Sequence, residues 1–395
     1  MLLAVMMLTV GCSDDSDERT ASGSFSSIEL VPYASSYTEV EPLISGTRAP
    51  DWAPNNFYEY GDLTGVSGML RSNEHAPISV YFTQDSPNNV ELLRRFSYGS
   101  SNQKWRIDEE VEHPGNYYLY GFVPSSAGSA SIEPNNTYAD GAKLTLTGLN
   151  SVMTQDLCFV VGAKHGNGDA TPVVPDTESG KVALGDFECY IQAGGNPNYI
   201  FLLFDHLYAA LRFRFRVDSK YAALRAIKLK KLELMAFKDE TCTQRMSKKM
   251  QTTVTLRKTT NGTSPIVSVS KFITDDITLG GSDDMDWAVI CDNESNPVLL
   301  PSGDNYTDNL GFVPKTSSYY QLRATYDVYD VDAAGNPRNL VRQDCVAENK
   351  IDPRKQFNQE ELERGYMYTL RLTVNPTYLY VLSEPDLDNP TMVLE

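Results

Sequence analysis

Apolar and polar residues alternate along most of the chain with the period of two that is typical of β-strands. The clearest example is the segment 211–217, in which leucine, phenylalanine and valine alternate with three arginines. In the segment 366–374, the alternate positions are Tyr, Tyr, Leu, Leu and Val. The segment 116–122 carries large apolar residues on both faces, which predicts a strand that is covered on both sides. These patterns predict a β-rich protein.

Interruptions of this alternation predict where strands bend and where short helices occur. The doubled lysine Lys230-Lys231 shifts the phase of an alternating segment, which predicts a β-bulge. One helical turn is expected over residues 221–225, and a short helix over 357–365 that ends at Gly365. Several short strands at about ten-residue spacing are typical of β-sandwiches.

Length and charge narrow the class of protein. A chain of 395 residues suggests two or three domains, and two sandwiches that meet near residue 200 fit that length. The net charge of −18 argues against a nucleic-acid partner, because little in the chain would neutralise phosphates. The 23 tyrosines suit half-buried strands.

The N-terminus carries the pattern of an export signal. An apolar run over residues 2–8 leads to Gly11-Cys12, and an acidic run follows at once. The run is too short for a transmembrane helix. This junction resembles the lipobox of bacterial lipoproteins, which implies that Cys12 becomes an acylated N-terminus held in the outer membrane. The acidic run is either a surface-export signal or a disordered tether, and both readings can hold together.

No catalytic or cofactor pattern is recognised in the sequence, so we expect no enzyme activity and no cofactor. The four histidines are scattered, and we interpret His206 as a structural histidine. Asp330-x-Asp332 and the acidic loop 283–286 are interpreted as a turn and a surface loop, so no metal site is expected. Beyond Cys12, five widely spaced cysteines indicate buried thiols, with one disulfide left open.

The chain resembles the fimbrillins of the Bacteroidetes, the subunits of the type V pilus. Four features carry the resemblance: the Gly11–Asp15 junction, the strand 116–124, the entry 204–207 into an alternating strand, and the strand 364–372. The resemblance implies an all-β fold of two tandem transthyretin-like or immunoglobulin-like β-sandwich domains. It also implies a removable N-terminal strand and an extended C-terminal tail.

The resemblance further implies how the protein is assembled. A trypsin-like, arginine-specific protease removes the N-terminal strand, and a neighbouring subunit inserts an extended segment into the groove. Arg48-Ala49 lies in a Gly- and Pro-flanked loop where a protease would reach it, whereas cleavage after Arg19 would leave the first strand in place. The expected donor anchors lie in the C-terminal tail: Tyr378, Tyr380, Leu382, Met392 and Leu394. The alternative is that this tail completes its own sheet.

These interpretations divide the chain into six segments. They are a signal peptide (1–11), a polar tether (12–26), the N-terminal strand and cleavable propeptide (27–48), two β-sandwiches (49–198 and 199–376), and a donor-strand segment (377–395). The expected function is that of a stalk pilin that polymerises with copies of itself and related fimbrillins at the cell surface and supports adhesion. The alternatives are a tip or anchor fimbrillin, or a monomeric glycan-binding surface lipoprotein.

Overall fold

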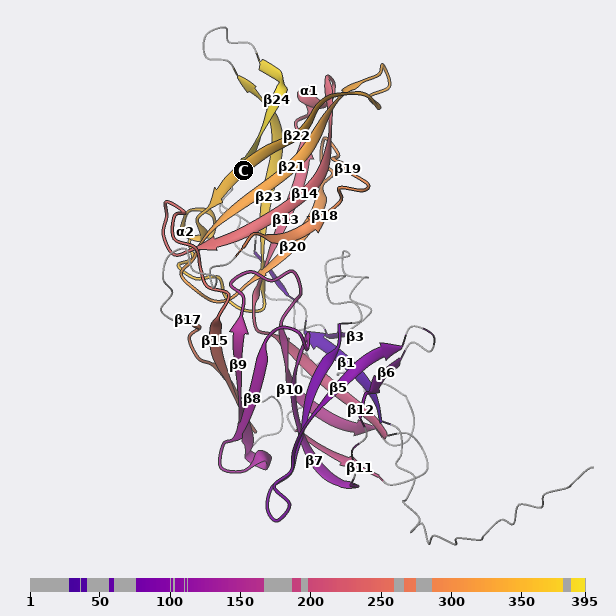
Figure 1. The fold of residues 1–395 in the computed structure, drawn as a ribbon, viewed down its shortest axis with the longest axis vertical. Helices are drawn as coiled ribbons and strands as arrows, with labels where there is room; N and C mark the ends of the chain where they lie inside the picture. Colours follow the sequence, from indigo (N-terminus) through magenta and orange to yellow (C-terminus); the bar gives the residue numbers. More distant parts are fainter. Residues whose placement is uncertain are drawn as a thin grey trace, which may run out of the picture.

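The computed structural model describes residues 28–35, 37–40, 57–59, 76–99, 101, 104–109, 111, 113–166, 187–192, 198–258, 266–274, 286–378 and 385–394. The molecule is elongated, with two units placed end to end along its long axis (Figure 1). Nearly every described element is a strand, so the all-β, multi-domain prediction is confirmed. Within the described residues, no helix has both the length and the apolar character needed to cross a bilayer.

The lower unit in Figure 1, here called the ring unit, contains a sheet that closes on itself. The strands run in the order β10-β12-β1-β6-β5-β4-β7, and β7 pairs again with β10. The strands of this sheet are β1 (Ile28–Ser35), β3 (Phe57–Glu59), β4 (Ile78–Thr83), β5 (Glu91–Gly99), β6 (Lys104–Ile107), β7 (Gly115–Val123), β10 (Cys158–Gly166), β11 (Glu188–Ile191) and β12 (Asn198–His206).

This closure is a detail that the sandwich prediction did not contain. The beginning of β10 pairs with β7, and all of β10 pairs with β12, so β10 joins the two ends of the sheet. The β10–β12 register shifts between Val160 and Gly162. A bulge of this kind bends a strand and increases its twist.

A second sheet of the ring unit combines strands from both halves of the chain. Its strands are β8 (Ser129–Pro134), β9 (Gly141–Leu149), β15 (Met250–Arg257), β16 (Ile266–Val269) and β17 (Ile273–Thr274), with a short 3-10 helix at Tyr138–Asp140. β9 pairs with β15 along most of its length. The hydroxyl groups of Tyr81 and Tyr120 in the ring donate to backbone oxygens of Ala130 and Tyr138, 2.8 and 2.6 Å away. These bonds tie the second sheet to the ring.

The upper unit, here called the sandwich unit, consists of two five-stranded sheets. One contains β2 (Thr38–Val40), β13 (Ala209–Val217), β20 (Thr307–Val313), β23 (Tyr366–Tyr378) and β24 (Pro385–Leu394). The other contains β14 (Arg225–Phe237), β18 (Ala288–Asp292), β19 (Val298–Leu299), β21 (Tyr319–Val331) and β22 (Pro337–Ile351). β24 contacts β22 and β20 contacts β18, so the two sheets meet along both edges.

The strongest sequence patterns produce the expected elements. The strands predicted over 116–122, 211–217 and 366–374 are present as β7, β13 and β23. The β14–β21 register shifts between Leu229 and Lys231, which confirms the predicted bulge. The predicted turn near 221 is helix α1 (Ser219–Ala222).

The helix predicted over 357–365 is wrong. Helix α2 covers Pro353–Phe357 instead, because the Asp352 side chain caps it and Pro353 occupies its first turn. Asn358 then adopts a left-handed conformation and ends it.

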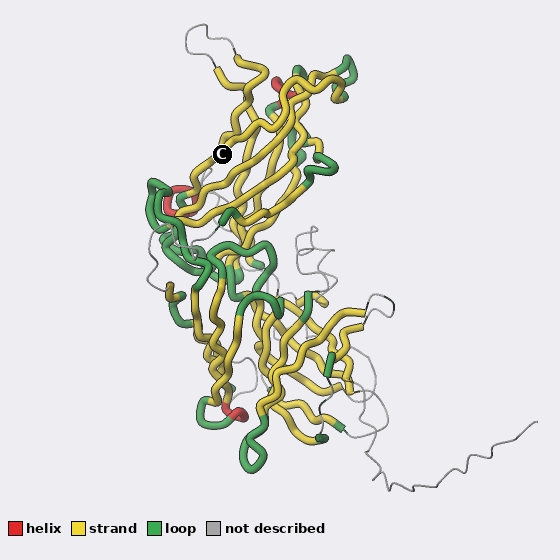
Figure 2. Tube along the Cα trace, viewed as in Figure 1, coloured by secondary structure: helices red, strands yellow, loops and turns green. Residues whose placement is uncertain are grey.

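The chain passes from the ring unit to the sandwich unit between β12 and β13. Leu207 donates its backbone N–H to Leu157, 2.7 Å away, and Gly365 donates to the Tyr208 carbonyl, 3.0 Å away. Loops gather at this junction (Figure 2). Strands β15, β16 and β17 belong to a ring-unit sheet although they follow β13 in sequence. The bounds predicted for independent domains stay a prediction.

Candidate functional site at the unit junction

The first described segment of the chain supplies strand β1 to the ring. β1 pairs in parallel with β12 over Ile28–Ala34. Its other edge pairs with β6 near Leu30 and with β3 near Ala34. Ile28 and Leu30 are only 4% and 3% exposed. β1 is therefore an interior strand with partners on both edges, and its alternate side chains enter the core.

The same segment then crosses to the sandwich unit. β2 pairs in parallel with β23, where Thr38 faces Tyr366 and Val40 faces Tyr368. The Arg212 guanidinium, which is 7% exposed, donates to Glu39 at 3.2 Å and to the Thr369 hydroxyl at 2.8 and 3.0 Å. Residues 28–40 thus contribute one strand to each unit.

Tyr37 lies between these two strands and reaches a buried polar cluster. Its hydroxyl donates to Asp156 Oδ1 at 2.7 Å, and its ring stacks on His206 with 3.7 Å between ring centroids. Phe312 of the sandwich unit lies on another side, 6.3 Å away between centroids. Burial and the Asp156 carboxylate raise the pKa of Tyr37 well above its usual value. The hydroxyl therefore remains a donor.

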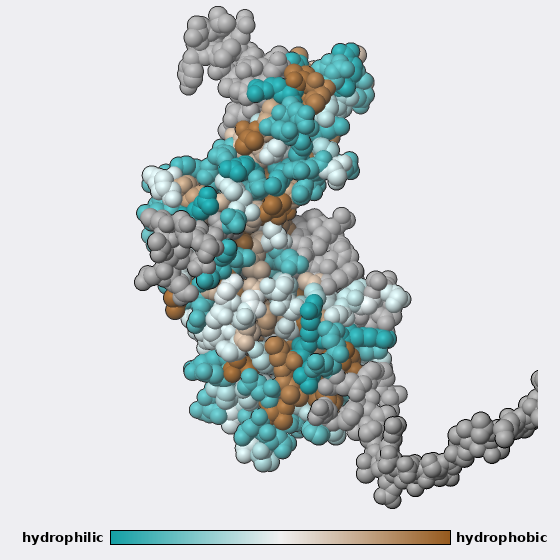
Figure 3. All heavy atoms as spheres, in the orientation of Figure 1, coloured by the Kyte–Doolittle hydropathy of each residue, from teal (hydrophilic) through white to brown (hydrophobic). Residues whose placement is uncertain are grey.

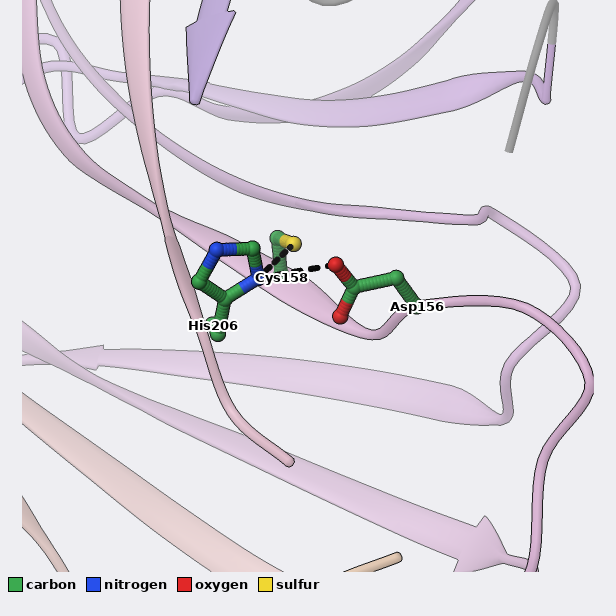
Figure 4. A group of neighbouring side chains, drawn as sticks. All are labelled: Asp156, Cys158 and His206. Atoms are coloured by element: carbon green, nitrogen blue, oxygen red, sulfur yellow. Dashed lines mark hydrogen bonds and ion pairs between the residues drawn. The ribbon is translucent and has the colours of Figure 1, made fainter. Parts of the chain in front are cut away.

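The cluster itself consists of Asp156, Cys158 and His206 (Figure 4). His206 Nδ1 lies 2.8 Å from Asp156 Oδ2 and 3.4 Å from Cys158 Sγ. All three residues are 1% exposed or less. Burial, followed by the nearby carboxylates of Asp156 and Asp205, raises the pKa of the Cys158 thiol well above its usual value. The thiol is therefore protonated in this arrangement.

A thiol, an imidazole and a carboxylate are also the parts of a cysteine-protease triad, but these three are not arranged as one. In a triad the nucleophile and the carboxylate bind opposite nitrogens of the imidazole ring, so that the ring carries a proton between them. Here both contacts are made to Nδ1 (Figure 4). With its sulfur fully buried and its pKa raised, Cys158 is not an activated nucleophile.

The junction is also held by a partly buried ion pair. Arg364 Nη1 lies 2.7 Å from Asp205 Oδ2 and donates to the His206 carbonyl at 3.2 Å. His206 is buried and hydrogen-bonded, as interpreted from the sequence. The five described cysteines are thiols rather than disulfides. On the face shown in Figure 3, the described apolar residues form small separate patches between polar ones.

The C-terminal tail lies on its own subunit. β24 pairs antiparallel with β23, where Leu394 faces Leu372 and Met392 faces Val374. Met392 is 4% exposed, and its carbonyl accepts a bond from the Asn349 side chain at 2.9 Å. β2 and β24 therefore occupy successive parts of the same β23 edge.

The other predicted site residues fall outside what can be described. Five of them lie outside the described residues, namely Cys12, Arg48, Ala49, Tyr380 and Leu382. For Tyr378 and Leu394, only the backbone is described. Lipidation, cleavage and donation by these residues stay predictions. The grouping of Tyr37 with Asp156 and Cys158 was not foreseen, and the short spacing Asp156-x-Cys158 was its only signal in the sequence.

Comparisons with known proteins add structural neighbours. No family model matches the chain, and no curated protein matches it. A candidate cell adhesion protein from Bacteroides fragilis is 11% identical with a TM-score of 0.36, and the alignment covers 93% of this chain and 97% of that one. A fimbrial protein from Bacteroides ovatus is 9% identical with a TM-score of 0.27, over 90% and 52% of the two chains.

The fimbrial anchor protein Mfa2 from Porphyromonas gingivalis is 10% identical with a TM-score of 0.23, over 92% of this chain and 95% of that one. All three are adhesion or fimbrial proteins, the class that the sequence resembles. At this level of sequence identity and TM-score, the neighbours assign no function to this chain. A functional proposal must therefore rest on the features of the chain itself.

Proposed function

We propose that this chain is a surface fimbrial subunit, and specifically a stalk pilin that polymerises by strand exchange. The observation that carries the proposal is the placement of residues 28–40, which supply β1 to the ring and β2 to the edge of β23. If cleavage after Arg48 released this segment, both sites would present unpaired backbone groups. An extended segment of a second subunit would satisfy those groups and fill the apolar positions.

In this proposal the precursor is lipidated at Cys12, held at the outer membrane, and trimmed by an arginine-specific protease. The C-terminal segment 377–395 then leaves its own β23 and enters the neighbouring subunit. Among the described strands, β24 pairs with β23 and also contacts β22, so its release breaks one described ladder. A joint formed by an inserted strand would be kinetically stable, because withdrawal breaks all its backbone bonds together.

The experiment compares trimmed protein with an Arg48→Ala variant. We expect trypsin-like trimming to yield oligomer ladders that resist heating in detergent, and the variant to remain monomeric under the same treatment. A third protein, truncated after Pro376, should be trimmed normally but should not polymerise. Fibres that grow from a chain carrying both changes would refute strand exchange.

A second candidate role is a subunit that ends the fibre, such as a tip or an anchor. The placement of β24 favours it, because Met392 is buried on its own body and bonded through Asn349. Mixing trimmed protein with the Pro376 truncation separates the two roles. A stalk subunit that lacks its tail should cap growing ladders and shorten them, whereas truncation of a subunit that donates no strand should leave ladder length unchanged.

A further inference from the structure

We propose that Asp156, Cys158 and His206 form a binding site for a single zinc ion at the junction of the two units. The three side chains offer a carboxylate oxygen, a sulfur and an imidazole nitrogen, and the ligand atoms all lie within 4.8 Å of one another. Zinc accepts each of these donor types. This inference does not depend on the fimbrial role.

The direction of the donor atoms supports the assignment. The sulfur of Cys158 and Oδ2 of Asp156 both face the same ring nitrogen, His206 Nδ1 (Figure 4). Because the sulfur and the carboxylate oxygen both contact His206 Nδ1, the three ligand atoms point toward a common position. The same arrangement excludes a catalytic triad. The Sγ–Nδ1 separation is 3.4 Å. Bonds of about 2.0 Å to nitrogen and 2.3 Å to sulfur in a tetrahedral site place those two ligands at about that spacing.

The Asp156–His206 contact must open slightly to admit the ion. The two atoms are 2.8 Å apart as hydrogen-bonded partners. Tetrahedral zinc requires about 3.3 Å between oxygen and nitrogen ligands, so the pair separates by about 0.5 Å when the metal replaces the shared proton. Three protein ligands leave one coordination position for a water molecule.

The charge balance around the cluster also favours a cation. Asp156 is a buried carboxylate, and a second carboxylate, Asp205, adjoins His206 in sequence and is paired with Arg364. On binding, the thiol proton of Cys158 passes to solvent, and His206 becomes the neutral tautomer that carries its proton on Nε2. No oxidation occurs. The ion supplies positive charge to the carboxylate and the thiolate, both of which are buried.

Tyr37 acts as a positioning residue in the proposed zinc site. Its hydroxyl holds Asp156 Oδ1 at 2.7 Å, which leaves Oδ2 directed at His206, and its ring covers the imidazole. A partner of this kind orients a ligand, and its loss typically lowers metal affinity 10–100-fold. Because Tyr37 belongs to the N-terminal segment, metal binding and retention of that segment should stabilise each other.

The experiment uses tag-free full-length protein that is treated with a chelator and then titrated with zinc or cobalt. Metal retained after gel filtration is measured by mass spectrometry, and thiolate ligation is measured as the sulfur-to-cobalt charge-transfer band. We expect about one zinc per chain, weakened at least tenfold in Cys158→Ala and about tenfold in Tyr37→Phe. Cys189→Ala is the matched control, because Cys189 is equally buried but lies in β11 outside the cluster. It should bind zinc like the wild type.

The cobalt spectra and the zinc content of the variants can either support or overturn the proposed site. A cobalt charge-transfer band that is present in the wild type and in Cys189→Ala but absent in Cys158→Ala supports the site. The proposal is overturned if the wild-type protein shows no such band, a result that requires no variant to fold. It is also overturned if Cys189→Ala loses as much zinc as Cys158→Ala.

Discussion

The two ends of the described chain complete the same molecule in different ways. Near the N-terminus, β1 has strand partners on both edges, and Tyr37 continues into a buried polar cluster. Near the C-terminus, β23 is the one strand within the described ranges that pairs with β24, which also contacts β22. An interior strand with side chains in the core is hard to remove without cutting the chain. A strand at an edge can leave and be replaced at lower cost.

This difference suggests a division of roles between the two ends. The N-terminal segment supplies β1 to the ring and joins the two units. In the proposed maturation, cleavage removes this segment from the fold. The tail occupies an adjoining stretch of the β23 edge, so its departure leaves both units largely intact. This difference in geometry predicts that the two ends contribute different amounts to the free energy of unfolding.

The largest effect is expected from deleting each end in turn. Removal of residues up to Arg48 takes the buried side chains of Ile28 and Leu30 from the core, and burial of each is worth about 1.5–3 kcal/mol. It also removes the partly buried Tyr37 and its hydrogen bond to Asp156, which is worth about 1 kcal/mol. We therefore expect a loss of about 5 kcal/mol or more in the free energy of unfolding, measured in urea. Deletion after Pro376 removes Met392 as its main described buried side chain and should cost about 2 kcal/mol. Equal losses would contradict the comparison.

A single core substitution at each end sharpens the same contrast. Leu30 and Met392 are almost equally buried, at 3% and 4% exposed. Substitution of a buried leucine or methionine by alanine costs about 2–5 kcal/mol, and more where the surroundings cannot close the cavity. We expect Leu30→Ala near the upper end and Met392→Ala near the lower end, because β1 has strand partners on both edges, whereas β24 is held by one described ladder, to β23, and by its contact to β22.

The control for both is Leu340→Ala on the exposed strand β22, where the side chain is 48% exposed. Its unfolding midpoint in urea should move little, since surface substitutions usually stay within about 0.5 kcal/mol. If Met392→Ala proved as costly as Leu30→Ala, the tail would be as firmly built into the subunit as β1.

Period-two alternation was sufficient to predict strands such as β13 and β23 and the bulge beside Lys231. Each of these depends on local side-chain spacing, which a sequence displays directly. The closure of the ring by β10 and β7 was not predictable in the same way, because it depends on which distant edges meet. The pairing of β9 with β15 joins segments about a hundred residues apart for the same reason.

The polar cluster shows the same limit for a candidate site. His206 could be interpreted as structural from its apolar neighbours, but its partners come from a loop and a strand about fifty residues earlier. Tyr37 is more distant still in sequence. Only the three-dimensional path of the N-terminal segment across the junction brings these residues together.

The smallest effect is expected at the charged contact of β2. Arg212 is 7% exposed, but its partner Glu39 is 48% exposed, so solvent screens the pair. Arg212 also keeps the Thr369 hydroxyl as an acceptor when Glu39 is changed. We therefore expect Glu39→Gln to cost about 0.5–1 kcal/mol in the free energy of unfolding at low salt. The difference should shrink in concentrated salt, because the Debye length falls to about 3 Å at 1 M. A loss that is much larger, or that does not respond to salt, would mean that β2 holds the sandwich unit as firmly as β1 holds the ring.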